Sequence, residues 1–437
     1  MTLKLTREQI MKLPKTDLHV HLDGSVSSQT IVELAKAQKV DLVKESKELG
    51  IGNLISGTAE ELDEKVFKHE YSSLMEYLIP FELVNCVLRT PESLEEVAYR
   101  MACDEFNEGV RYFEVRFAPQ KHWRRDLGWE DIIKSVDKGL RRAMDEFNSK
   151  DGVKKNGEMP YRCAMILCAM RMIGPNMGDY FSTLYDLHTG DDLQSLSQMA
   201  ANEIAQLAID SMKKGYLVVG FDLAGREDGY PAAVYSESFE LCYNSGVQTT
   251  CHAGEAYGPE SIMGAIKYCN VRRIGHGTHL FEWEKIQRRN PDGSEMTKEQ
   301  KIDYMRLVAE RMARERTTIE VCLKSNSQTS PDLRDISKHP VRDFLKYNLR
   351  VALSTDNRVI SRVSVTDEYI SLIKNFPVSV KELRNLCLAG FKGAFFPGSY
   401  ANHREYMRKS IDFYDVAFNN YIAKGTHIDK LEMVEIA

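Results

Sequence analysis

Residues 16–24 read TDLHVHLDG and decide how the rest of the chain is interpreted. His19 and His21 stand two apart in an apolar, β-branched stretch, and alternate residues of a strand point to the same face. Both imidazoles therefore project from one side of one strand, as two ligands of one metal ion would. Asp23 comes next on that face, and Gly24 ends the strand. Because most isolated H-x-H pairs lie on the surface by accident, the remaining ligands must be sought elsewhere in the chain.

The composition is that of a soluble globular protein with a large core. The chain has 437 residues, of which 43% are hydrophobic and 28% are charged. This length would suggest two or three domains, but α/β barrels with insertions also exceed about 400 residues, and we expect a single domain over residues 1–437. The formal net charge of −6 argues against nucleic acid or an anionic membrane as the main partner.

Cysteine usage and the start of the chain favour a cytoplasmic location. The nine cysteines form no C-x-x-C pair, and an odd number without a framework spacing is typical of reduced thiols. Residues 1–17 are charged and lack the apolar core of a signal sequence. The longest apolar run, residues 163–170, is too short to span a bilayer. We therefore expect a soluble cytoplasmic protein that does not bind a membrane.

Short apolar runs alternate with long amphipathic stretches, which is typical of βα units around a parallel sheet. Eight runs rich in β-branched and aromatic residues are expected to form strands: residues 16–22, 111–119, 161–170, 217–224, 247–253, 272–278, 317–325 and 350–356. Five stretches repeat apolar residues with helical spacing: residues 27–39, 91–108, 129–147, 196–214 and 298–314. This pattern predicts an α/β fold, a (β/α)8 TIM barrel with additional helices and surface insertions.

Four segments fall outside the regular units. The long excursion 40–81 follows the first strand at the ligand-binding end of such a barrel, and we interpret it as a lid or pocket wall. Residues 148–160 and 290–301 are polar, contain Gly or Pro, and are expected to be solvated loops. The amphipathic, Tyr-rich tail 399–437 is expected to form C-terminal helices over the barrel or to contribute to an oligomer contact.

Histidines and carboxylates gather at the expected strand ends, which form the active-site face of this fold. The fifth strand ends TTCHAGE, with His252 and Glu255. The sixth ends RIGHG with His276, and the eighth ends LSTDN with Asp356. Four of the eleven histidines thus converge on one mouth, which distinguishes a metal site from an accidental pair. The other seven lie mostly in loops or helices and are given no role.

The donor types at these strand ends suit one zinc ion. Zinc takes imidazole and carboxylate ligands and keeps an open position for water in catalytic sites. The same donors would also admit iron, manganese or cobalt. The fourth strand ends FDLAGRE, with Asp222, Gly225 and Glu227, and no lysine stands there to be carbamylated. One metal ion per chain is therefore a better expectation than a two-metal centre.

Taken together and in order, the motifs TDLHVHLDG, DLAG, CHAGE, RIGHG and STD resemble those of the adenosine deaminase family of metal-dependent barrel aminohydrolases. The resemblance covers most of the chain, from residue 14 to residue 396. The spacing of 24 residues between the histidines of CHAGE and RIGHG is also similar to that of the family. The resemblance implies that one Zn²⁺ ion per chain is bound by His19, His21, His252 and Asp356.

The resemblance also implies roles for the remaining strand-end residues. Glu255 would be the proton donor and acceptor, and His276 would orient and stabilise the attacking hydroxide. Gly225 would contact the purine through its backbone, and Asp23 would contact the sugar 5′-hydroxyl. The chemistry agrees, because attack on carbon 6 of a purine requires protonation of ring nitrogen 1, which a carboxylic acid kept neutral by desolvation can supply. The alternatives are an ion-paired Glu255 at the rim and His276 as a fifth metal ligand.

Asn357 departs from the family pattern, which usually has a second Asp after the metal-binding one. That second carboxylate contacts purine nitrogen 7. An unprotonated Asp cannot donate a hydrogen bond to this acceptor, whereas an Asn amide can. The substitution therefore bears on purine affinity and selectivity more than on the hydrolytic chemistry.

The expected function is hydrolytic deamination of adenosine and 2′-deoxyadenosine to the inosine nucleosides and ammonia. Rival substrates are adenine, AMP and N6-methyl-AMP. A phosphate would need a basic pocket or a helix N-terminus, and Asp23 near the sugar 5′ position would repel it. A catalytically silent purine-nucleoside-binding protein is the alternative from another class. The expected partner is a small-molecule purine nucleoside, with no nucleic acid, and the chain is expected to be a monomer or a weak homo-oligomer.

Overall fold

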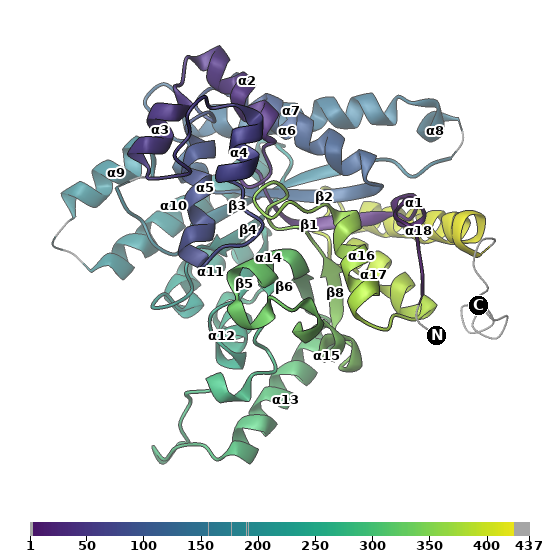
Figure 1. Cartoon of the computed structure of the whole chain (residues 1–437). Coiled ribbons are helices and arrows are strands. Elements are labelled where there is room, and N and C mark those ends of the chain that lie inside the picture. Colours follow the sequence, from purple (N-terminus) through teal and green to yellow (C-terminus); the bar gives the residue numbers. More distant parts are fainter. Residues whose placement is uncertain (1–2, 156, 176, 189, 191, 424–437) are drawn as a thin grey trace.

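Eight parallel strands follow one another around a barrel in the order in which they occur in the chain (Figure 1). The computed structural model describes residues 3–155, 157–175, 177–188, 190 and 192–423. The strands are β1 (Lys15–His21), β2 (Val110–Phe117), β3 (Arg162–Met170), β4 (Val218–Ala224), β5 (Gln248–Ala253), β6 (Arg273–His276), β7 (Thr318–Val321) and β8 (Arg350–Leu353). Each strand pairs in parallel with the next, which confirms the predicted (β/α)8 barrel.

The eighth strand returns to the first through Asp356, which follows β8. The backbone N–H of Asp356 donates to the carbonyl oxygen of His19 at 2.8 Å, and the N–H of His21 donates to the carbonyl oxygen of Asp356 at 2.7 Å. Val20 and Asp356 also form an isolated parallel bridge. The seam that closes the barrel thus carries three of the four residues expected to bind metal.

Helices surround the barrel and match the amphipathic stretches to within a few residues. These are α2 (Ser28–Gln38), α6 (Pro91–Asn107), α7 (Trp129–Asn148), α10 (Leu193–Lys213) and α13 (Lys298–Glu315). The other α-helices are α1 (Arg7–Lys12), α3 (Leu42–Glu48), α4 (Ala59–Lys65), α5 (Leu74–Asn85), α8 (Asp151–Lys154), α9 (Gly178–Leu187), α11 (Ser236–Asn244), α12 (Pro259–Cys269), α14 (Leu323–Thr329), α15 (Val341–Lys346), α16 (Val365–Asn375), α17 (Val380–Gly393) and α18 (Tyr400–Phe418).

The seventh strand is shorter than the sequence predicts. The expected strand covers residues 317–325, but β7 ends at Val321 and α14 begins at Leu323. The buried carboxylate of Glu368 accepts hydrogen bonds from the backbone N–H of Leu323 at 2.8 Å and of Lys324 at 2.9 Å. It thereby satisfies two free donors in the first turn of α14. Since Glu368 is 45 residues from Leu323, no local sequence pattern indicates where this helix begins.

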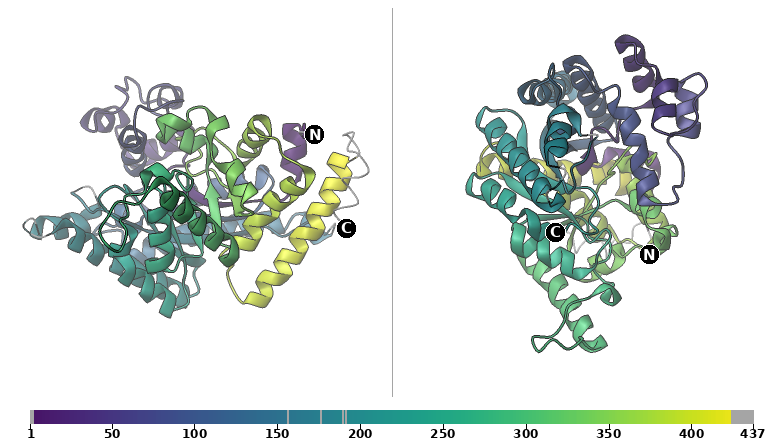
Figure 2. Two further views of the ribbon diagram at one scale, coloured as in Figure 1. Left: turned by 90° about the horizontal axis from the view of Figure 1, so that it is seen from below. Right: turned by 90° about the vertical axis from the view of Figure 1, so that its left-hand side faces the viewer.

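Residues 40–81 contribute α3, α4 and most of α5, which gather on the side of the barrel away from α18 (Figures 1 and 2). Tyr77 of α5 is buried, and its hydroxyl lies 2.7 Å from the hydroxyl of Ser361, which follows β8. This contact brings α5 against the C-terminal ends of the strands, the position expected of a pocket wall.

The two polar insertions and the C-terminal region lie on the outside. Residues 148–155, 157–160 and 290–301 are largely exposed. The predicted loops are helical in part, because residues 151–154 form α8 and α13 begins at Lys298. At the other end of the barrel, Tyr406 of α18 donates from its hydroxyl to the carbonyl oxygens of Arg111 at 2.6 Å and Pro160 at 2.8 Å. Residues 424–437 of the expected tail lie outside the described residues. Among the described helices, none is long and apolar enough to cross a membrane.

Candidate active site

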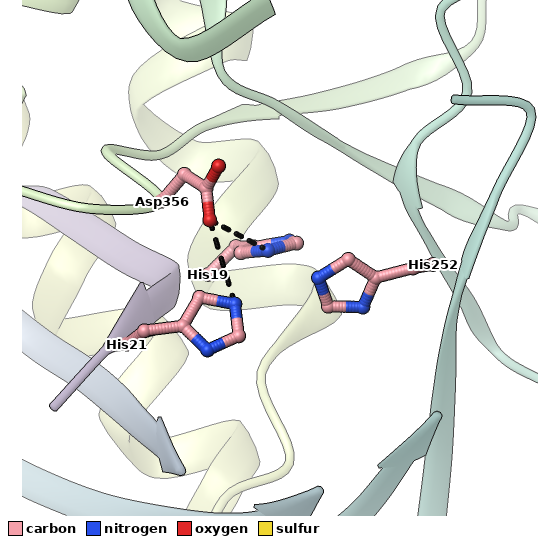
Figure 3. A group of neighbouring side chains, drawn as sticks. All are labelled: His19, His21, His252 and Asp356. Atoms are coloured by element: carbon pink, nitrogen blue, oxygen red, sulfur yellow. Dashed lines mark ion pairs between the residues drawn. The ribbon is translucent and has the colours of Figure 1, made fainter. Parts of the chain in front are cut away.

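Three imidazoles and one carboxylate meet at the C-terminal ends of β1, β5 and β8 (Figure 3). The Oδ1 atom of Asp356 lies 3.5 Å from Nε2 of His19 and 3.4 Å from Nε2 of His21. With His252, each residue offers one ligand atom, and these atoms all lie within 4.8 Å of one another. The Nε2 atom of His19 is buried, and beyond this ion-pair contact with Asp356 it has no hydrogen-bond partner among the described residues. Because buried polar atoms are almost always paired, this orphaned nitrogen and its neighbours fit a bound metal ion.

Two buried carboxylates orient the imidazoles from behind. The Nδ1 atom of His19 lies 2.8 Å from Oε2 of Glu320, and the Nδ1 atom of His252 lies 3.1 Å from Oδ2 of Asp222. Ionised carboxylates only accept hydrogen bonds, so both Nδ1 atoms carry the hydrogen and both Nε2 lone pairs are free. Carboxylates commonly fix metal-binding histidines in this way.

The barrel interior beneath the cluster is filled by ion pairs. Arg116 lies 2.8 Å from both Asp222 and Glu320, and Arg273 lies 2.6 Å from both Glu320 and Glu114. Although burial opposes ionisation, Arg116 and Arg273 hold the pKa of Glu320 well below its usual range. Asp222, Glu320 and Glu114 are thus three buried acids paired with two buried guanidinium groups, and the carboxylate of Asp356 in the cluster is a fourth buried acid. The two formal negative charges left over match the charge of a divalent cation.

Glu255 and His276 flank the cluster. The Nε2 atom of His276 lies 3.9 Å from Oε1 of Glu255. Burial, together with the carboxylates of Asp356 and Glu227, raises the pKa of Glu255 to about 8. Glu255 is therefore a predominantly neutral acid at neutral pH. On its other side, the Nδ1 atom of His276 lies 3.0 Å from the side-chain amide nitrogen of Asn326.

A cavity of about 300 Å³ opens onto the cluster. Asp23 lines it, and its Oδ1 atom is buried without a hydrogen-bond partner. Burial raises the pKa of Asp23 to about 6. Glu82 and Lys121 also line the cavity and pair with each other at 2.6 Å. The apolar part of the wall comes from Leu78, Ile79, Phe81, Ala118, Cys168, Met170 and Ala224.

Gly225 and Asn357 also line the cavity, as does Arg226, which pairs with Asp228 at 2.6 Å. Gly225 has a φ of +92°, and a Cβ atom there would lie 3.1 Å from Cε of Met170. The amide nitrogen of Asn357 donates to the Tyr77 hydroxyl at 2.8 Å, while its Oδ1 atom is buried without a partner. A Cβ atom on Gly24 would lie only 2.0 Å from that oxygen, so this close approach requires glycine. The contact with Tyr77 uses one of the two amide hydrogens and leaves the other for a ligand.

Comparison with known proteins identifies the family. The sequence profile of adenosine deaminase matches residues 14–189 and 191–425. The chain belongs to the adenosine deaminase family. The adenosine deaminase of Mycobacterium marinum is 31% identical over 396 residues, which cover 90% of this chain and 94% of that protein. The activity class expected from the sequence, a hydrolytic deaminase, is thereby confirmed.

Solved structures share the barrel. An amidohydrolase from Burkholderia ambifaria with bound Zn superposes with a TM-score of 0.68 at 17% identity, covering 96% of each chain. An N6-mAMP deaminase from Arabidopsis superposes with a TM-score of 0.66 at 21% identity, covering 93% of this chain and 99% of that chain. At these identities the likeness shows the fold alone.

The structure brings all the site residues expected from the sequence to one place. The four expected metal ligands form the cluster, and the other five line the cavity beside it: Asp23, Gly225, Glu255, His276 and Asn357. Their individual roles in an enzyme of the adenosine deaminase family stay predictions, to which the geometry gives physical support.

Several supporting residues were not found by sequence reasoning. Glu320 and Arg116 stand inside apolar strands, where a charged residue signals a buried ion pair without naming its partner. The sequence around Asn326 and around Tyr77 contains no motif that indicates a role in the site. Glu227 lies in the FDLAGRE motif, but only the structure gives it a function: its carboxylate accepts the backbone N–H groups of residues 254–257 at 2.8–3.1 Å.

Proposed function

We propose that the protein deaminates adenosine and 2′-deoxyadenosine hydrolytically, giving inosine or 2′-deoxyinosine and ammonia, with one zinc ion per chain. The observation that carries the proposal is the buried His19–His21–His252–Asp356 cluster at the end of an apolar cavity, with the uncharged acid Glu255 beside it. Membership of the adenosine deaminase family supports the same reaction.

The cluster would hold zinc through the three imidazoles and the carboxylate of Asp356. Three imidazoles and one carboxylate are donors that zinc prefers, although iron and cobalt accept them too. The zinc found in the Burkholderia ambifaria protein of the same fold supports this choice. A bound zinc ion would lower the pKa of water to about 7 and so supply a nucleophile near neutral pH.

Glu255 is proposed to move the protons of the reaction. The neutral acid gives its proton to purine nitrogen 1 as a C–O bond forms at carbon 6. The resulting carboxylate then takes a proton from the added hydroxyl and passes it to the departing amine. The C–N bond breaks, ammonia leaves, and a proton from the next water molecule returns Glu255 to its neutral form. The raised pKa of Glu255 suits this exchange, because an acid–base group works best when its pKa is near the operating pH.

The remaining residues are proposed to position the reactants. His276 would orient and stabilise the attacking hydroxide, and the backbone of Gly225 and the amide of Asn357 would contact the purine ring. Asp23 would accept the sugar 5′-hydroxyl, and its unpaired buried Oδ1 atom supports this assignment. A hydroxyl group there would satisfy an acceptor that otherwise has no partner.

A nucleotide substrate such as N6-methyl-AMP is the main rival, and the charges near Asp23 disfavour it. The ammonium group of Lys121 forms an ion pair with the carboxylate of Glu82 at 2.6 Å, so its positive charge is already neutralised. A 5′-phosphate would therefore approach two acids, Asp23 and Glu82. The two bases that line the cavity are already paired, Lys121 with Glu82 and Arg226 with Asp228 at 2.6 Å. Like-charge contacts of this kind cost several kcal/mol.

Steady-state kinetics of the zinc-loaded protein test the proposal, with adenosine, 2′-deoxyadenosine, adenine, AMP and N6-methyl-AMP as substrates and ultraviolet absorbance as the readout. We expect the two nucleosides to give the highest kcat/KM and AMP to be at least about 100-fold slower. Faster turnover of adenine or a nucleotide would replace the proposed substrate. Nucleoside binding without turnover of any of the five would overturn the assignment as an enzyme and leave a silent binding protein.

We also propose that the enzyme works in the cytoplasm as a monomer or a weak homo-oligomer. All nine cysteines are free and most are buried, as expected in a reducing compartment. Sedimentation across a range of protein concentrations would test the oligomeric state, and a stable dimer at nanomolar concentration would contradict it.

A further inference from the structure

Three buried side chains behind the cluster form a row of hydrogen bonds that ends at His276. His339 lies just before α15, which begins at Val341, and its Nε2 atom is 3.2 Å from Oδ1 of Asn326 in α14. The amide nitrogen of Asn326 is 3.0 Å from Nδ1 of His276. His339, Asn326 and His276 are at most 3% exposed. No solvent molecule is needed to complete the row. The proposed chemistry gives a role to His276 but none to Asn326 or His339.

The direction of every hydrogen bond in the row follows from one backbone group. The N–H of Val341 points at Nδ1 of His339 at 3.1 Å, and a backbone N–H can only donate. The Nδ1 atom of His339 must therefore be the acceptor. Because a neutral imidazole carries its hydrogen on the other nitrogen, Nε2 of His339 is the donor to the oxygen of Asn326.

The orientation of the Asn326 amide fixes the direction of the next hydrogen bond, to His276. Since its oxygen accepts from His339, the amide of Asn326 presents its NH₂ group to His276. The Nδ1 atom of His276 is consequently an acceptor and carries no hydrogen. Its hydrogen lies on Nε2, the atom that is 3.9 Å from Oε1 of Glu255. Burial lowers the pKa of His339 to about 3, so a charged His339 does not disturb this order at neutral pH.

We propose that His339 and Asn326 are positioning residues that hold His276 as the neutral Nε2–H tautomer. The direction of the hydrogen bonds does not depend on the substrate, but its catalytic meaning rests on the proposed function. A neutral Nε2–H donor can orient the attacking water and stabilise the charge that develops on it. It has no lone pair on Nε2 and cannot take the proton of that water. Proton transfer is thus assigned to Glu255 alone.

Asn326→Asp reverses the polarity of the row with almost no change in shape. An aspartate offers only acceptors, so it would draw a hydrogen onto Nδ1 of His276. Gln328→Glu is the matched control, because Gln328 lies on the same helix and its amide donates to the His69 carbonyl at 3.0 Å, away from His276. Two further variants change His339. His339→Leu removes the Nε2–H group that donates to Asn326, whereas His339→Gln supplies an amide that can donate to Asn326 and accept from the N–H of Val341.

Two measurements test the tautomer of His276 and its effect on catalysis. The first is ¹⁵N NMR of histidine-labelled protein, with the His276 signals assigned from their loss in His276→Gln. The second is kcat and KM for adenosine. We expect wild-type His276 to be unprotonated at Nδ1, and Asn326→Asp to place a hydrogen there. We expect kcat to fall about 10²- to 10⁴-fold with little change in KM, as when a catalytic histidine is held in the wrong tautomer.

The control Gln328→Glu and the two His339 variants distinguish a role in positioning His276 from a role in packing alone. Gln328→Glu should leave the His276 signals unchanged, and His339→Gln should recover most of the kcat lost in His339→Leu. A wild-type His276 with hydrogen on Nδ1 would overturn the proposal, as would unchanged kcat in a variant whose tautomer is reversed. If wild-type protein does not deaminate adenosine, the proposed function fails, but the NMR result still decides the tautomer.

Discussion

The side chain of Glu255 combines burial with two neighbouring carboxylates, which raises its pKa to about 8. If it supplies the proton for purine nitrogen 1, Glu255→Gln should lower kcat at least about 10³-fold, since an amide cannot give up a proton at neutral pH. Metal content should remain near one ion per chain, because Glu255 is not one of the expected ligands. Glu260→Gln, at the half-buried start of α12, is the control and should retain its activity. Equal turnover in Glu255→Gln would remove this residue from its role.

The same pKa sets the direction of a pH effect. A carboxyl group whose pKa is raised keeps its proton through neutral pH and loses it as the pH increases past about 8. We therefore predict that kcat/KM for adenosine falls on the alkaline side with an apparent pKa near 8, about tenfold for each further pH unit. Rates measured at constant ionic strength from pH 6 to pH 10 check this. A profile that stays flat to pH 10 would show that the protonated form of Glu255 is not required.

Sequence reasoning found the residues that end strands but not the residues that support them. His252 and Glu255 share one short motif, so a single strand end reveals both. Glu320 and Asn326 act on histidines that lie 301 and 50 residues away in the chain. Their local sequence contains no trace of these partners, because the barrel alone brings them together.

At the scale of the strand and its following loop, two site residues have a backbone conformation that the sequence does not reveal. His276 and Asp356 have φ values of +64° and +62°, in the left-handed region that residues other than glycine rarely adopt. Such conformations are found where a site needs a side chain at a particular angle. The sequence predicted that both residues end strands. His276 does end β6, but β8 already ends at Leu353, and the left-handed conformation was foreseen for neither residue.

The loop that carries Glu255 depends on Glu227, whose carboxylate accepts the N–H groups of residues 254–257. Glu227→Gln removes an acceptor and the negative charge that helps to raise the pKa of Glu255. We predict a loss in kcat of about 10- to 100-fold through misplacement of the acid. The alkaline limb of the pH profile should also move to lower pH.

The control for this variant is Glu237→Gln, which removes an exposed glutamate of the neighbouring helix α11. It should leave both the rate and the pH profile as they are. A Glu227→Gln enzyme with a reduced rate but an unmoved alkaline limb would show that Glu227 affects only folding of the loop.

For the whole molecule, the alternation of strands and helices was sufficient to predict the barrel, because buried parallel strands and amphipathic helices have distinct periodicities. The sequence could not predict how residues 40–81 pack. Their placement depends on single contacts such as the Tyr77 hydroxyl with Ser361, between segments 284 residues apart. Likewise, burying any one charged residue inside the barrel would destabilise the fold. Burial becomes favourable only within the set that we call the ionic core: Arg116, Arg273, Asp222, Glu320, Glu114 and Asp356.

That ionic core links the stability of the barrel to metal binding. Four buried acids and two buried guanidinium groups leave two negative charges, which a divalent cation would neutralise. Asp222→Asn removes one of these charges while keeping an oxygen near Nδ1 of His252. We predict that zinc affinity, measured by competition with a chromophoric chelator, falls about 10- to 100-fold. At a fixed zinc concentration well above Kd, this loss corresponds to about 1.4–2.7 kcal/mol of zinc-dependent stabilisation.

A second carboxylate–histidine pair provides the matched control for Asp222→Asn. His279 and Glu282 pair at 2.7 Å outside the ligand cluster, so Glu282→Gln makes the same chemical change without touching the ionic core. It should leave zinc affinity unchanged. Chelation of the wild-type protein should lower Tm by several degrees, and this shift should be smaller in Asp222→Asn because less zinc-dependent stability is present to lose. Equal zinc affinity in wild type and Asp222→Asn would show that the core charges serve the barrel alone and not the metal site.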